Sequence, residues 1–163
     1  LALLSTWLAR SSAQAVAGGY ANLHIWAAAV GLEEWLLPFS LAALLALGAW
    51  MYAHRDPDLW VLLGVTALVA RFWAYHRLYD DLLVLLPLVT LFRLAKEGPL
   101  EDGTDVKAGL LLTVTLAAML LPARLSWASW PWKLTFRVGH ALTWAAILVY
   151  LLCYAHRRQI RER

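Results

Sequence analysis

Ionisable side chains are concentrated in the stretch RFWAYHRLYDDLLVLL, which begins at Arg71 and separates two apolar runs. Guanidinium groups pair with two phosphate oxygens at once, so Arg71, Arg77 and His76 predict a binding site for an anionic group such as a lipid phosphate. The neighbouring carboxylates of Asp80 and Asp81 could bind sugar hydroxyls or act as a base. Because charges are costly beside hydrocarbon, this cluster indicates a polar cavity or a functional site.

Two other interpretations of the cluster stay open. At helical spacing Arg77 can pair with either Asp80 or Asp81, so the cluster could be a salt-bridged turn between two spans. That turn, however, would contain none of the Gly, Pro and Asn residues that usually form turns. A divalent metal ion held by His76 and both carboxylates is disfavoured, since adjacent residues of a helix point in different directions. We therefore expect no resident metal ion or other cofactor.

A second candidate site is PARLSWASWPWKLTFR, residues 122–137, which contains three tryptophans beside basic residues and no acidic one. One interpretation is an aromatic belt at the membrane surface. Another is a lip that holds a polyprenyl chain against tryptophan and its phosphate against a basic side chain, and sugar stacking on tryptophan is a further option. The spacing does not separate these alternatives, and the lipid-contacting candidates are Trp127, Trp130, Trp132 and Lys133.

Other chemistries find little support. The single cysteine, Cys153, lies in an apolar run, so neither a disulfide framework nor a thiolate metal site is predicted. The five histidines fall near predicted helix ends without a metal-binding motif, and no glycine-rich phosphate loop or Ser-His-Asp arrangement occurs. The net charge of +3 is explained by basic residues beside apolar runs, which suit anionic lipid, so no nucleic-acid partner is expected.

Composition predicts the elements that position these residues. Hydrophobic residues make up 62% of the 163 residues and charged residues 15%, against about 45–50% and about 25% in soluble proteins. Long apolar runs without alternation favour helices over a barrel. We expect an all-α, polytopic transmembrane bundle in residues 36–155, with about five spans at 36–53, 59–75, 82–95, 108–121 and 138–155. Pro87 would kink the third span.

The flanking segments predict an orientation. Residues 1–35 are expected to form an extracytoplasmic segment with a short membrane-surface helix capped by Asn22. Residues 156–163, HRRQIRER, are expected to form a basic cytoplasmic tail, and lysine and arginine near the span ends are then in modest excess on the cytoplasmic side. Because the chain opens on Leu1 with an incomplete apolar run, we expect it to belong to a longer polypeptide.

The stretch YHRLYDDLLVLLP combines a polar, aromatic turn containing Tyr-Asp with a leucine-rich helix that includes a proline. It resembles the late part of the membrane glycosyltransferases of family 87, the bacterial alpha-mannosyltransferase-like group with the GT-C fold. The upstream stretch GGYANLHIWAAAVGL resembles that family's short polar segment before a membrane-surface helix. The resemblance covers roughly residues 10–95.

The resemblance implies a bacterial inner-membrane enzyme that transfers a hexose, mannose-like, from a polyprenyl-phosphate donor on the extracytoplasmic side. In GT-C enzymes the catalytic carboxylate generally lies in the first extracytoplasmic loop, so this chain is expected to be a C-terminal portion without the main base. Asp80 and Asp81 are weak candidates, and Asp81 stands where some relatives have leucine. The residues carried over as substrate-binding are His76, Tyr79 and Asp80, with Asn22 and His24 from the upstream segment.

Two rival functions are compatible with the same residues. In the first, the chain is a non-catalytic membrane subunit whose charged turn docks a partner protein. In the second, it is part of a lipid or solute transporter, and the cluster lines a pathway. A transporter needs polar groups at mid-span depth, and the sequence offers Thr66, Thr113, Thr115 and Thr143.

Overall fold

The computed structural model describes Leu3, Thr6 and residues 30–54, 58–73, 83–97, 105–120 and 130–161. Across these ranges the fold is all-helical and no strand occurs, which confirms the predicted all-α class for the described part. A short 3₁₀ turn, Glu33–Trp35, leads into the first long helix. The helices are α3 (Leu36–Ala53), α4 (Leu59–Trp73), α5 (Leu85–Glu97), α6 (Val106–Leu120) and α7 (Trp130–Arg161).

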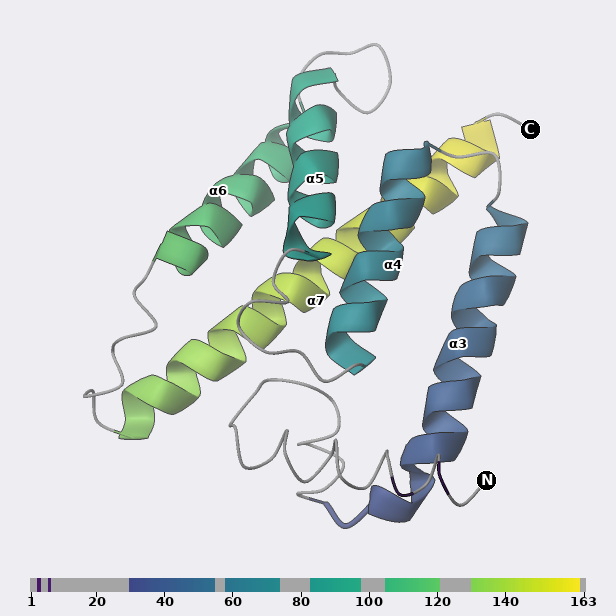
Figure 1. Cartoon of the computed structure of the whole chain (residues 1–163). Helices are drawn as coiled ribbons and strands as arrows, with labels where there is room; N and C mark the ends of the chain where they lie inside the picture. Colours follow the sequence, from purple (N-terminus) through teal and green to yellow (C-terminus); the bar gives the residue numbers. More distant parts are fainter. Residues whose placement is uncertain are drawn as a thin grey trace.

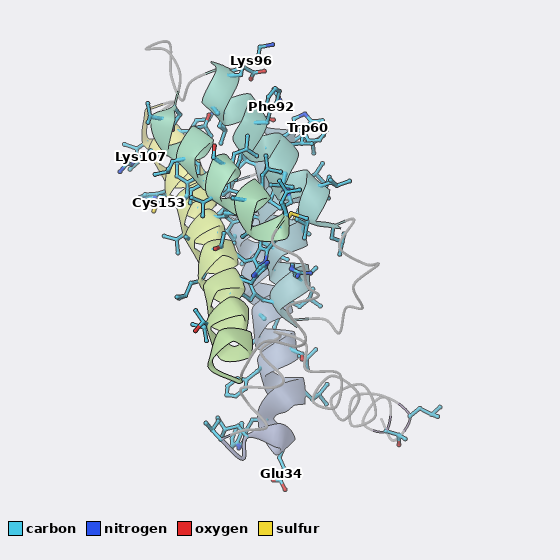
Figure 2. The ribbon with its side chains drawn as sticks, turned by 90° about the vertical axis from the view of Figure 1, so that its left-hand side faces the viewer. Glu34, Trp60, Phe92, Lys96, Lys107 and Cys153 are labelled. Atoms are coloured by element: carbon cyan, nitrogen blue, oxygen red, sulfur yellow. The ribbon has the colours of Figure 1, made fainter. Side chains whose placement is uncertain are left out.

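Successive helices run in alternating directions (Figure 1). The C-terminal ends of α3, α5 and α7 therefore gather at one end of the molecule with the N-terminal ends of α4 and α6. In Figure 2 Lys96 and Lys107 lie at this end, and Glu34 lies at the other. We call the first the polar end, because Asp58, Arg93, Glu97 and Asp105 lie there.

The interior lies between α4, α5 and α7, where apolar side chains recur at intervals of three and four residues. α6 packs against α5 and α7 and adds Ala108, which is fully buried. α4 contacts α3, α5 and α7, so it is the central helix of the described bundle. The main buried residues of the three core helices are Val61, Val65, Leu68, Leu88, Leu91, Leu94, Trp144, Ile147, Leu151 and Ala155.

Three helices approach one another closely at Gly64 of α4. A Cβ atom at this position would lie 2.9 Å from Thr90 Oγ1 of α5 and 3.1 Å from Leu151 Cδ1 of α7. Thr90 Oγ1 lies 2.7 Å from the Trp60 carbonyl oxygen and 2.8 Å from that of Leu86, and donates its proton to these carbonyls. Glycine therefore permits three helices to meet, as small residues do at helix crossings in membranes.

One described helical segment, Val138–Ile160 of α7, is long and apolar enough to cross a membrane. Shorter apolar segments occupy α3, α4 and α6. α3 lies at the edge of the bundle, and Leu44 and Leu45 are 66% and 72% exposed. Membrane association is thus indicated by α7, and the five-span arrangement remains a prediction.

The predicted spans agree with the helices to within a few residues, except at α7. The range 36–53 coincides with α3, and α5 covers Leu85–Glu97 against the predicted 82–95. Pro87 falls in the first turn of α5, where a missing N–H breaks no helical hydrogen bond, so its position requires no kink.

α7 contains 32 residues and begins at Trp130, inside the segment 122–137 that was predicted to be a loop. It also continues to Arg161, past the predicted span end at residue 155. The prediction ended the helix where hydrophobicity ended. Arginine and glutamine are good helix formers outside apolar surroundings too, and Pro131 is tolerated in a first helical turn.

Candidate functional site

Arg71 is the one predicted substrate-binding residue whose side chain the structure describes. It lies in the last turn of α4, and its guanidinium carbon is 5.3 Å from the ring centroid of Trp144 on α7. Trp144 is only 5% exposed. A cation over an aromatic face is attracted by the ring quadrupole, and more strongly where water is excluded. The pair therefore holds a positive charge at the junction of α4 and α7.

Trp144 also brings a hydrogen-bond donor to this junction. Its indole Nε1 is buried and has no hydrogen-bond partner within the described part of the chain. The indole N–H can donate and cannot accept. We call Arg71 and Trp144 the Arg71–Trp144 pair: it offers a cation and an N–H group, which suit the binding of an anionic oxygen.

Sequence reasoning missed Trp144, because a tryptophan inside an apolar run is typical of core packing. One signal was available. Trp144 shares its helix face with Ile147 and Leu151, at spacings of three and seven residues, a pattern typical of side chains that point into a core. A buried tryptophan normally has a hydrogen-bond partner for its N–H group, so an unpartnered one indicates a position where a ligand could bind.

Most of the predicted site residues have side chains that the structure does not describe. Trp130, Trp132 and Lys133 fall in the first turns of α7, but their side chains are not described. The predicted residues that lie outside the described ranges are Asn22, His24, His76, Arg77, Tyr79, Asp80, Asp81 and Trp127.

The polar end contains a second cluster of charged groups. Asp58 Oδ1 accepts the backbone N–H of Trp60 at 3.0 Å, which caps the start of α4, and also pairs with Arg93 Nη1 at 3.3 Å. Arg93 Nη2 is 3.3 Å from a carboxylate oxygen of Glu97, and its guanidinium carbon lies 5.7 Å from the Trp60 ring centroid. These groups bind one another, so the cluster joins α4 to α5.

Asp105 joins α6 to α7 in the same way. Its Oδ1 accepts the N–H groups of Lys107 at 2.9 Å and Ala108 at 3.2 Å, and its Oδ2 accepts the hydroxyl proton of Tyr150 at 2.6 Å. Burial opposes the charged form, but the hydrogen bonds from Tyr150 and the two backbone N–H groups outweigh it. The pKa of Asp105 is lowered as a result.

The described residues contain no group of three or more His, Cys, Asp and Glu side chains that could hold a metal ion. The four mid-span threonines also offer little for transport. Each hydroxyl donates to a carbonyl oxygen four residues earlier in its own helix, at 2.6–2.9 Å, and is therefore used locally. The threonines are Thr66, Thr113, Thr115 and Thr143.

The Arg71–Trp144 pair can bind and polarise an anion, through the Arg71 guanidinium and the indole N–H of Trp144. Comparison with known proteins does not narrow the ligand: no protein-family model, curated protein or solved structure matches this chain.

Proposed function

We propose that this chain is the C-terminal part of an integral membrane glycosyltransferase that uses a polyprenyl-phosphate-linked sugar donor on the extracytoplasmic side. Its contribution is to bind the lipid phosphate. The observation that carries the proposal is the guanidinium of Arg71 on the buried Trp144 ring, at the point where α4 leads into the sequence YHRLYDDLLVLLP. That sequence carries the resemblance to family 87.

The alternating helices support the proposed orientation (Figure 1). Basic residues are concentrated at the polar end, and lysine and arginine favour the cytoplasmic side of membrane proteins. With the polar end in the cytoplasm, Arg71 lies toward the opposite, extracytoplasmic side. The described basic residues near the polar end are Arg93, Lys96, Lys107, Arg157, Arg158 and Arg161.

In the proposed mechanism a base activates an acceptor hydroxyl, which displaces the lipid phosphate from the sugar. Charge accumulates on the phosphate oxygens as the bond breaks, and a positioned cation stabilises that charge. Arg71 has this role. The base lies in a part of the parent protein outside this chain, and Asp80 and Asp81 are not assigned to it.

The test is glycosyl transfer by the intact parent protein in membranes that contain a polyprenyl-phosphate-linked sugar. Arg71→Ala is expected to lower kcat by about 100-fold, the scale of removing one group that stabilises transition-state charge. Arg71→Lys keeps the charge but not the bidentate geometry, so it should restore part of the rate. Arg93→Ala at the polar end is the matched control and should leave transfer unchanged. Equal rates for Arg71→Ala and Arg93→Ala would refute the proposal.

A second candidate, a non-catalytic membrane subunit, is favoured by the exposure of α3. Leu41, Leu44 and Leu45 are all more than half exposed on this helix, a surface that either lipid or a partner helix could cover. Replacing Arg77 and Asp80 by alanine separates the candidates. Normal transfer with loss of complex assembly supports the subunit, and loss of transfer in an intact assembly supports the enzyme.

A further inference from the structure

The buried donor of Trp144 calls for an acceptor. An unpaired N–H in the interior forfeits the hydrogen bond it would make to water, and nearly all buried polar groups in native proteins have a partner. Trp144 is 5% exposed, and the described part of the chain provides no hydrogen-bond acceptor for its Nε1. Its ring face is already engaged by Arg71.

We propose that the indole N–H of Trp144 donates a hydrogen bond to a phosphate oxygen of a lipid-linked phosphate bound at Arg71. The ligand class rests on the proposed function, and the role of Trp144 goes beyond it. Arg71 supplies charge from the ring face of Trp144, and the indole N–H supplies a directed donor in the ring plane. A phosphate has several oxygens, so one can accept from the indole while another faces the guanidinium.

The arrangement also gives Trp144 a use that phenylalanine cannot fill. Burial in the core cluster and attraction to Arg71 need only an aromatic ring, and phenylalanine provides one. Tryptophan differs from phenylalanine here in its N–H group and in its larger ring, and only the N–H group can donate a hydrogen bond. Trp144→Phe therefore removes the proposed contact and retains most of the surface that packs in the core.

Trp60→Phe is a matched control, because Trp60 also carries a guanidinium over its ring, that of Arg93, but at the polar end. The purified protein in detergent is titrated with a short-chain polyprenyl phosphate, and binding is followed by the ¹⁵N–¹H resonances of the indole groups. The chain has ten tryptophans, and the signal that Trp144→Phe removes is that of Trp144.

The Trp144 signal is expected to shift downfield on titration, and Trp144→Phe should weaken binding by about tenfold, since a hydrogen bond to a charged group is lost. Trp60→Phe should bind as the unchanged protein does. An unmoved Trp144 signal during saturable binding, or equal affinity of Trp144→Phe and Trp60→Phe, would overturn the proposal. Thermal unfolding and circular dichroism of each variant show that the affinities compare folded proteins.

Further titrations identify the source of the phosphate. Inorganic phosphate and the uncharged polyprenol are expected to leave the Trp144 signal unmoved at concentrations where polyprenyl phosphate shifts it. A shift with polyprenol alone contradicts phosphate recognition. An equal shift with phosphatidylglycerol supports Trp144 as a phosphate donor but assigns it to bulk lipid, which removes support from the glycosyltransferase proposal.

The two proposals can fail separately. Loss of transfer in Arg71→Ala with unaltered phosphate affinity in Trp144→Phe retains the enzyme and rejects the role of Trp144. Weakened phosphate binding in Trp144→Phe, in a parent protein that transfers no sugar, retains the binding site and rejects the enzyme.

Discussion

Within the described helices, two arginine–tryptophan pairs lie toward opposite ends of the bundle, and they differ in what surrounds them. At the polar end, Arg93 lies over Trp60 and also pairs with the carboxylates of Asp58 and Glu97. Toward the other end, Arg71 lies over Trp144, whose buried N–H has no partner within the described residues. The same pairing of side chains therefore links helices in one place and leaves a donor for a ligand in the other.

The comparison shows that an arginine over a tryptophan does not by itself indicate a site. What distinguishes the two pairs is the buried indole N–H of Trp144, which has no hydrogen-bond partner among the described residues. One described buried nitrogen at the polar end also lacks a hydrogen-bond partner. The Nδ1 atom of His54 lies 2.9 Å from the Trp50 carbonyl oxygen, and its buried Nε2 has no partner among the described residues. No cation accompanies that nitrogen in the described contacts, so we assign it no ligand.

The largest effect on stability is expected from a substitution at Gly64, in the helix α4 that contains both Trp60 and Arg71. Gly64→Val would place side-chain atoms against Thr90 and Leu151 and push α4 away from α5 and α7. Overpacking of this kind costs about 1–3 kcal/mol, and we expect the upper end of that range. Thermal unfolding in detergent measures it. Gly48→Val on α3 has open space within 4 Å and serves as the control, so similar losses for both would contradict the close approach.

The next largest effect is expected at Asp105. Asp105→Ala removes the cap of α6 and leaves the Tyr150 hydroxyl without its acceptor, which together should destabilise the protein by about 2 kcal/mol. Tyr150→Phe removes the hydroxyl donor of the same hydrogen bond but leaves the cap of α6 intact. It should therefore lower the free energy of unfolding by less than half as much as Asp105→Ala. The double variant gives the coupling between the two residues. Strictly additive losses would show that the 2.6 Å contact adds no stability.

Asp105 also predicts a dependence on pH. Its pKa is lower in the folded protein than in the unfolded chain, so its stabilising contribution is complete above the unfolded value of about 3.9 and is lost as the pH falls through the lower folded value. Thermal stability should therefore decline below about pH 4. Asp105→Asn retains a capping oxygen without the titration and should flatten this part of the curve. An unchanged curve would assign the decline to other carboxylates.

The smallest effect is expected for Arg93. Its ion pairs with Asp58 and Glu97 are partly exposed to solvent, and such pairs contribute less than about 1 kcal/mol. Arg93→Ala should thus lower the unfolding temperature slightly, and raising the salt concentration should narrow the difference. A loss as large as that of Gly64→Val would mean that the polar end, rather than the helix crossing, holds α4 and α5 together.

The positions of the helices could be predicted from the sequence, but the side-chain contacts between them could not. A run of apolar residues predicted α3 with its observed ends, because hydrophobic length and helix length coincide there. The start of α7 was wrong, since Trp130 and the basic residues after it continue a helix beyond its apolar part. Contacts such as Asp58 with Arg93, or Arg71 with Trp144, depend on how each helix is rotated about its axis. Uniformly apolar spans carry little information about that rotation.

The length of α7 has a consequence for the depth of the proposed phosphate. Trp144 follows Val138, the start of the apolar segment, by six residues, which is about 9 Å along a helix. A phosphate held there would lie below the level of ordinary lipid headgroups, with its polyprenyl chain already in hydrocarbon. The depth of Trp144 would then select the ligand. A phosphate on a long, flexible isoprenoid tail can reach Trp144, whereas the headgroups of the surrounding phospholipids stay at the membrane surface.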